Sequence, residues 1–115
     1  MNESWIVYAV IVAVVVLVTV FKRMGQISSE RAHALVASGA KLVDVRTSGE
    51  FATGHIPGAV NVPLQELRAR SSTLGEKSQP VILYCASGTR SAMARSMLKG
   101  QGFTQVFNLG SMRRW

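Results

Sequence analysis

One uninterrupted apolar segment near the N-terminus constrains this chain more than any other feature. From Trp5 to Phe21 the sequence reads WIVYAVIVAVVVLVTVF, and Thr19 is its single polar residue. A helix of this length would extend about 25 Å, close to the ~30 Å hydrocarbon thickness of a bilayer. Because apolar residues would face almost every direction around it, the segment lacks the polar face of a surface helix. We therefore predict a transmembrane helix at residues 5–21, after a short flank at residues 1–4.

Two other interpretations of this segment are a cleavable signal sequence and a buried core helix. A signal sequence carries basic residues before its apolar region and a small-residue cleavage site after it. Here Glu3 precedes the segment, and Lys22 and Arg23 follow it. All 13 Lys and Arg residues come after residue 21, so the positive-inside rule places the C-terminal domain in the cytoplasm. We accordingly expect a single-pass protein of the inner or plasma membrane.

The remainder of the chain has the composition of one small globular domain. With 115 residues and one cysteine, the chain cannot form an internal disulfide framework. The net charge of +7 suits a domain held near an anionic membrane surface. It does not indicate nucleic-acid binding, because the basic residues are dispersed and form no continuous stripe. One cysteine and two histidines without paired spacing also give no reason to expect a metal site.

Strand-like and helix-like segments alternate after the apolar segment. A linker at residues 22–26 leads into a domain at residues 27–115, whose first helix is expected to begin after Ser28 and to end near Gly39. Short apolar runs predict strands at 42–45, 60–62, 81–84 and 105–109, with helices at 64–71 and 91–99. The segment rich in glycine and proline between the first two strands is expected to be a loop. This order predicts an α/β domain with a small parallel central sheet flanked by helices.

The only cysteine, Cys85, lies where the third expected strand ends and a tight loop begins. A helix follows, so backbone N–H groups and the positive end of the helix dipole can face the sulfur. Arg90 adds a positive charge, and such surroundings lower the pKa of a thiol and make it nucleophilic. The alternative is that Cys85 is an ordinary small buried residue. The loop expected to bind the sulfur comprises Ala86, Ser87, Gly88, Thr89, Arg90 and Ser91.

A second polar segment, Asp44-Val45-Arg46, ends the first expected strand. Because ligands bind beyond the carboxyl ends of parallel strands, we expect this triplet and Cys85 to share one site. Asp44 and Arg46 are candidates to shape the entrance of the pocket, although an ion pair or loop-fixing hydrogen bonds are the favoured interpretation. His55, in a turn with glycine and proline, is expected to secure that turn rather than to act as a base.

Other polar and sulfur-containing side chains are expected to have structural roles or none. His33 is expected to be exposed on the first helix of the domain. Met93 and Met97 lie four residues apart on the last helix and are expected to be core contacts. Arg95 and Lys99, on the same helix, are expected to form its solvated face.

The motifs of this chain resemble those of the rhodanese (thiosulfate sulfurtransferase) family. The resemblance is carried by CASGTRS at residues 85–91, by Asp44-Val45-Arg46 with Glu50-Phe51, and by GHIPGA at residues 54–59. A glycine-containing turn that ends in tryptophan follows at residues 110–115, with Ser111 where the family usually has a second glycine. The resemblance covers residues 26–115 and implies a single rhodanese domain.

This resemblance implies a membrane-anchored sulfurtransferase that carries a persulfide on Cys85. The donor would be a small molecule with a sulfane sulfur, such as thiosulfate, and the acceptor cyanide or a thiol, including a protein thiol. No metal or organic cofactor is implied. The alternative is a non-catalytic rhodanese-like adaptor or sulfur-sensing module at the membrane. Related dual-specificity phosphatases have a longer loop between the cysteine and the arginine, which disfavours a phosphatase.

Overall fold

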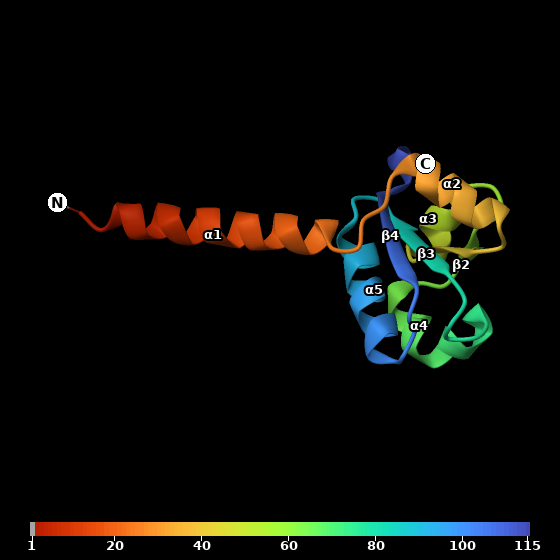
Figure 1. The fold of residues 1–115 in the computed structure, drawn as a ribbon. Helices are drawn as coiled ribbons and strands as arrows, with labels where there is room; N and C mark the ends of the chain where they lie inside the picture. The colour runs from red at the N-terminus through yellow and green to blue at the C-terminus, as the bar shows by residue number, and fades with distance from the viewer. Residues whose placement is uncertain (1) are drawn as a thin grey trace.

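A long helix extends away from a small α/β domain (Figure 1). The computed structural model describes residues 2–115. Helix α1 (Ser4–Arg23) contains the whole apolar segment and continues through Lys22 and Arg23. None of its residues is buried, and it is the one helix within residues 2–115 that is long and apolar enough to cross a membrane. The interpretation as a buried core helix is therefore wrong.

Four strands form one parallel sheet in the order β2-β1-β3-β4. They are β1 (Lys41–Asp44), β2 (Val60–Asn61), β3 (Val81–Cys85) and β4 (Val106–Ser111). Strand β3 is central and all five of its residues are buried, which its continuous apolar sequence predicts. The register of β3 against β4 shifts between Leu83 and Tyr84. The predicted parallel α/β sheet is confirmed.

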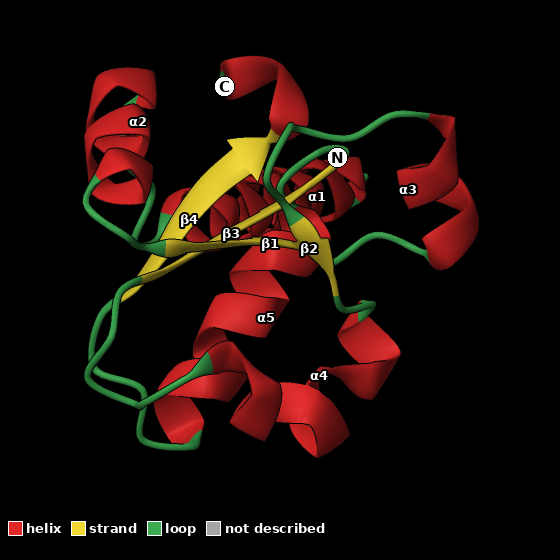
Figure 2. Ribbon diagram, turned by 90° about the vertical axis from the view of Figure 1, so that its right-hand side faces the viewer, coloured by secondary structure: helices red, strands yellow, loops and turns green. Residues whose placement is uncertain are grey.

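Helices cover both faces of the sheet (Figure 2). On one face lie α4 (Leu64–Arg70), a 3₁₀ turn (Ser71–Leu74) and α5 (Thr89–Gly100). On the other lie α2 (Ser29–Ala37) and a C-terminal 3₁₀ turn (Met112–Arg114). Successive side chains of a strand point to opposite faces. Cys85 therefore belongs to the core on the α4–α5 side, whereas Tyr84 belongs to the core on the α2 side.

The segment expected to be a loop after the first strand contains a short helix, α3 (Ser48–Thr53). A capping box explains it: the Glu50 N–H donates to the Thr47 hydroxyl, and the Thr47 N–H donates to the Glu50 carboxylate. The prediction of a loop is therefore wrong for residues 48–53. The helix matters for the site because it holds Glu50 in a fixed position.

Two predictions for α5 are also wrong. Met93 is 48% exposed and is not a core contact, whereas Met97 packs against the core as expected. Arg95 is half-buried, and its Nε donates a hydrogen bond to the Val106 carbonyl oxygen at 3.0 Å. The face of α5 that carries Arg95 therefore meets β4 and the segment after α1 instead of solvent.

Candidate active site

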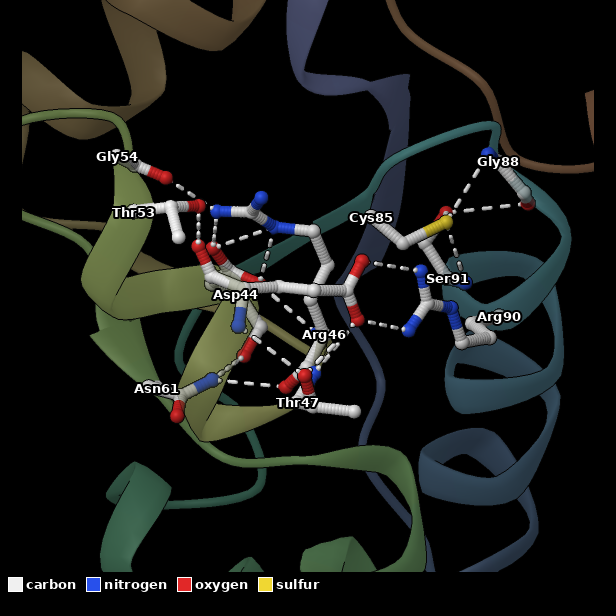
Figure 3. Close-up of polar contacts among 11 residues, drawn as sticks. Asp44, Arg46, Thr47, Thr53, Gly54, Asn61, Cys85, Gly88, Arg90 and Ser91 are labelled. Carbon is white, nitrogen blue, oxygen red and sulfur yellow. Dashed lines mark hydrogen bonds and ion pairs between the residues drawn. The ribbon is translucent and has the colours of Figure 1, made fainter.

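Cys85 is the last residue of β3 and lies at the carboxyl edge of the sheet, directly before α5. Its side chain has no exposed surface. The loop between β3 and α5 folds over it, so that Gly88 and Ser91 face the sulfur (Figure 3). The strand thus holds one side of the cysteine and the first turn of a helix holds the other.

Hydrogen-bond donors converge on the Cys85 sulfur. The Gly88 N–H donates to Sγ at 2.9 Å and the Ser91 N–H at 3.4 Å. Gly88 can make this contact because it adopts a left-handed conformation with φ of 100°, which side chains other than glycine rarely tolerate. A Cβ atom at this position would lie at ordinary contact distance, 3.4 Å, from the Gly110 Cα, so the backbone conformation and not crowding calls for glycine. The glycine is therefore required for the shape of the loop.

The Ser91 hydroxyl is placed to respond to the charge on the sulfur. The thiol of Cys85 donates to the Ser91 Oγ at 3.5 Å, and the hydroxyl donates to the Gly88 carbonyl oxygen at 3.1 Å. A hydroxyl can rotate its one proton between acceptors. When the thiol ionises, the Ser91 hydroxyl can turn to donate to the thiolate, so the site can serve both protonation states.

The pKa of Cys85 is lowered from its ordinary value. Burial by itself raises the pKa, because it penalises the charged thiolate. Hydrogen bonds from the Ser91 hydroxyl and from the Ser91, Gly88 and Ser87 N–H groups outweigh that penalty. The N-terminus of α5 points at the same sulfur and favours negative charge there. The hydrogen bonds of the loop thus favour the thiolate form of a buried cysteine.

Arg90 does not act as a free positive charge beside the sulfur. Its guanidinium makes a two-pronged ion pair with the Glu50 carboxylate, with distances of 2.6 and 3.0 Å. The hydrogen bond to Glu50 raises the pKa of Arg90, and the same hydrogen bond lowers the pKa of Glu50 to about 2. The expectation from the sequence lacked this partner: Arg90 interacts with the charge on Cys85, but as a member of an ion pair with Glu50.

Asp44 and Arg46 form a second ion pair at the end of the adjacent strand. The Arg46 Nη2 lies 2.7 Å from the Asp44 Oδ2, and both side chains are buried. Arg46 also donates to the Gly54 carbonyl oxygen at 2.6 Å. The hydrogen bond to Asp44 raises the pKa of Arg46. The Asn61 side chain donates to the backbone carbonyl oxygens of both Asp44 and Arg46. Because Arg46 lies before α3 and Gly54 lies after it, the Arg46 hydrogen bond to Gly54 connects the two ends of that helix.

Residues of α3 and of the turn after it contact both Arg46, which follows β1, and Arg90, which follows β3 (Figure 3). Arg46 fixes the carbonyl oxygen that follows α3, and Glu50 on α3 holds Arg90 in the first turn of α5. The sequence motif contains Glu50, but no sequence argument assigned it a partner. The Thr47–Glu50 spacing of a capping box was the signal that could have placed Glu50 on a helix.

The histidines lie in other contacts. His55 Nδ1 lies 2.9 Å from the Phe51 carbonyl oxygen, and its ring stacks on Phe51 with a centroid distance of 3.6 Å. This geometry agrees with a turn-securing role. His33 is exposed, as expected, but it also stacks on Trp115 with a centroid distance of 3.7 Å. Sequence reasoning did not foresee that the C-terminal tryptophan docks on α2.

Comparison with known proteins agrees with this geometry. The model of the rhodanese-like domain family matches residues 28–115, which include both strand ends and the whole sulfur-binding loop. This chain belongs to the rhodanese-like family. Among solved structures, the human single-domain sulfurtransferase TSTD1 is similar, with a TM-score of 0.70 and 30% identity over 79% of this chain and 94% of that one.

Two curated relatives show how far the similarity extends. The chain is 42% identical over 77 residues to the uncharacterized protein YqhL of Bacillus subtilis, which covers 66% of this chain and 60% of YqhL. It is 36% identical over 98 residues to the thiosulfate sulfurtransferase GlpE of Pseudomonas savastanoi, which covers 84% of this chain and 89% of GlpE. The chain thus spans less than two thirds of YqhL but most of GlpE.

Proposed function

We propose that this protein is a sulfurtransferase that carries a persulfide on Cys85. The observation that carries the proposal is the set of hydrogen bonds at the buried sulfur: two backbone N–H groups donate to it at the N-terminus of α5, and its thiol donates to the Ser91 hydroxyl oxygen. A structural cysteine needs none of these donors, whereas a thiolate or a persulfide anion requires them in a buried position. The similarity to sulfurtransferases such as GlpE and TSTD1 supports the same function.

The reaction is a double displacement at sulfur. The Cys85 thiolate attacks the outer sulfur of thiosulfate, a new S–S bond forms, and the bond within thiosulfate breaks to release sulfite with the electron pair. Cyanide or a thiolate then attacks the outer sulfur of the persulfide. The products are thiocyanate or the persulfide of the acceptor, and the Cys85 thiolate is regenerated. No net oxidant or reductant is consumed in either step.

The loop controls access of the sulfur donor to Cys85 and stabilises the persulfide that forms there. Cys85 has no exposed surface, while Ala86 and Ser87 above it are exposed. The donor therefore reaches the sulfur when these loop residues shift outward, and the N–H groups of Gly88 and Ser91 then hold the negative persulfide. Arg90, paired with Glu50, contributes orientation of the loop more than net charge.

Helix α1 is proposed to anchor the enzyme in a membrane. Its apolar side chains are exposed along its whole length, for example Trp5 at 63%, Val12 at 60% and Leu17 at 68%. In water this surface would be costly to hydrate, and a bilayer removes that cost. The distribution of Lys and Arg supports a cytoplasmic location for the domain. A reporter fused after Trp115 tests the orientation, since activity of the reporter only outside the cytoplasm would contradict it.

Turnover of thiosulfate with cyanide tests the proposed activity. The full chain in detergent is expected to form thiocyanate, and Cys85→Ser is expected to form none. Ser87→Ala is the matched control, because the Ser87 hydroxyl lies in the same loop but, within residues 2–115, makes no hydrogen bond to the sulfur. Turnover that survives in Cys85→Ser would overturn the proposal, as would a folded chain that loads no sulfur from any sulfane donor.

A further inference from the structure

A cavity lies between the end of α1 and the outer side of the sulfur-binding loop. Its volume is about 260 Å³, and its walls include three basic side chains, Lys22, Arg23 and Arg114. Gln26 and Ser87 add neutral hydrogen-bonding groups, and among residues 2–115 no carboxylate lines the cavity. Water occupies about 30 Å³ per molecule in the liquid, so there is room for a phosphate group with several waters.

The basic groups of this cavity have no acidic partners in the part of the chain that the structure describes. Each ion pair found within residues 2–115 involves another arginine: Arg46, Arg70 or Arg90. Arg114 is held in place by donating through Nε to the Leu109 carbonyl oxygen at 2.8 Å and through Nη2 to the Ile27 carbonyl oxygen at 2.9 Å. These contacts leave its positive charge uncompensated. Three such charges in one cavity favour a ligand with more than one anionic oxygen.

The cavity has a fixed position relative to α1, because the buried side chain of Asn108 joins α1 to the sheet. Asn108 Nδ2 donates to the Lys22 carbonyl oxygen at 3.0 Å, and its backbone N–H donates to the Gly25 carbonyl oxygen at 2.9 Å. Ile27 completes the connection by donating to the Asn108 carbonyl oxygen. The end of α1 is thus tied to β4, and Figure 1 shows it beside the loop that enters α5.

This position corresponds to the headgroup layer if α1 spans a bilayer. Thr19, the single polar residue of the apolar segment, lines the cavity on one side, and Lys22 lies one turn further along. Basic residues directly after an apolar helix lie at the level of the lipid phosphates. Favourable interaction of Lys22 and Arg23 with the helix dipole would explain those two residues alone, but not the convergence of Arg114, Gln26 and Ser87.

We propose that this cavity is a phosphate-binding site, with the phosphate of an anionic lipid as its ligand at the membrane surface. The choice of a lipid as the ligand depends on the proposed membrane insertion of α1, whereas the inference that the cavity binds a phosphate group depends only on the residues that line it. The Lys22 Cε lies 3.8 Å from the place of a Cβ on Gly88, whose N–H donates to Cys85. A bound phosphate would therefore sit directly behind the loop that holds the reactive sulfur.

The test uses the full chain in nanodiscs of phosphatidylcholine with or without phosphatidylglycerol. Native mass spectrometry after release from the discs is expected to show retained phosphatidylglycerol in preference to phosphatidylcholine. Lys22→Gln with Arg23→Gln is expected to weaken retention about 30-fold, since each basic group near an anionic surface contributes about a factor of five. The control, Arg68→Gln with Lys77→Gln, removes the same charge from exposed residues outside the cavity and is expected to retain the lipid.

A second variant controls for the possibility that loss of Lys22 and Arg23 changes the orientation of α1 in the bilayer. Gln26→Glu keeps every basic residue but places a carboxylate in the cavity, so it is also expected to reduce retention, by about fivefold for one unit of charge. Retention that is unchanged in both cavity variants, or lost equally in the control, would overturn the proposal. In a parallel arm, inorganic phosphate is titrated into the phosphatidylcholine samples. Binding that needs Lys22 and Arg23 there, without retention of phosphatidylglycerol, would assign the site to soluble phosphate.

Sulfur loading of Cys85, measured on the same samples, separates the two proposals. A chain that loads sulfur but binds neither form of phosphate overturns the phosphate site alone. A chain that binds phosphate but loads no sulfur overturns the sulfurtransferase proposal alone. If the chain does not enter the discs, the membrane anchor is wrong, and the arm with inorganic phosphate is then run in detergent to test the cavity.

Discussion

Two arginine–carboxylate pairs lie at neighbouring strand ends, and they differ in burial. In the Asp44–Arg46 pair the carboxylate is fully buried and the arginine side chain is 7% exposed. In the Glu50–Arg90 pair both side chains are about a third exposed, at 36% and 33%. A buried pair cannot be broken without leaving a charge in the interior, whereas water and ions screen an exposed one. The Asp44–Arg46 pair therefore stabilises the fold, whereas the Glu50–Arg90 ion pair can break and re-form at low cost.

Neither pair donates a hydrogen bond to the reactive sulfur. Its hydrogen bonds come from Gly88 and Ser91 in its own loop. The two pairs instead set the position of α3 and of the first turn of α5. The ion pairs thus stabilise the fold, and the loop hydrogen bonds stabilise the sulfur anion. Substitutions can test each of these roles separately.

Removal of the buried carboxylate should destabilise the protein most. Asp44→Ala is expected to lower the free energy of unfolding by about 3–5 kcal/mol, because Arg46 keeps its charge in a buried position without a partner. Urea denaturation of the full chain in detergent measures the change. Glu66→Ala is the control, since it breaks the exposed 3.7 Å pair with Arg70 on α4 and should cost less than about 1 kcal/mol. Equal losses in the two variants would contradict a structural role specific to Asp44.

Loss of the Ser91 hydroxyl should affect the sulfur but not the fold. In Ser91→Ala the pKa of Cys85 is expected to rise by about one unit, because a hydrogen bond to a charged group contributes about 1.5 kcal/mol. The thiolate is the reactive form, so less of it is present at neutral pH and alkylation there slows. The rate of alkylation by iodoacetamide as a function of pH gives the pKa, with Ser87→Ala as the control. An unchanged midpoint would show that Ser91 does not stabilise the thiolate.

Breaking the exposed pair should affect stability less than breaking the buried one. Glu50→Gln keeps the capping box of α3, since glutamine can accept the same N–H, but removes the charge that offsets Arg90. Unfolding should change less than in Asp44→Ala, and the difference should fade in about 1 M salt. The pKa of Cys85 should fall further, because Arg90 then presents its full charge. Slower alkylation at neutral pH would contradict this sign.

Acid titration gives the same pair a second test. The pKa of Glu50 is lowered from 4.5 to about 2, chiefly by the hydrogen bond from Arg90. A carboxyl group with a lowered pKa contributes stability above its ordinary value and loses that contribution as the pH falls through the lowered value. The difference in stability between the wild-type chain and Glu50→Gln should therefore be present above about pH 4.5 and vanish towards pH 2. A difference that persists at pH 2 would contradict the assignment.

Local sequence signals were sufficient to predict most of the sheet and the position of Cys85. A short β-branched run predicted β1, a continuous apolar run predicted β3, and a serine cap predicted the start of α2. Helix α3 was missed because its six residues include Gly49 and show no apolar periodicity, and only the capping box identifies it. Contacts between segments that are far apart in the sequence were harder to predict than local elements.

The side chains that were misassigned all depend on contacts between distant segments. The sequence of α5 does not reveal that α1 and β4 pack beside it, so Arg95 was expected in solvent and Met93 in the core. Likewise, nothing local to Arg90 shows that Glu50, 40 residues earlier, pairs with it. Asn108 was not singled out, although its side chain joins α1 to the sheet.

The most direct test of sulfur transfer is the intact mass of the full chain after incubation with thiosulfate. A gain of about 32 Da, the mass of one sulfur atom on a thiolate, is expected in the wild-type chain and absent in Cys85→Ser. Cyanide should remove the added mass and release an equal amount of thiocyanate. A folded chain that gains no mass, or a gain that persists in Cys85→Ser, would contradict the assignment of Cys85 as the sulfur carrier.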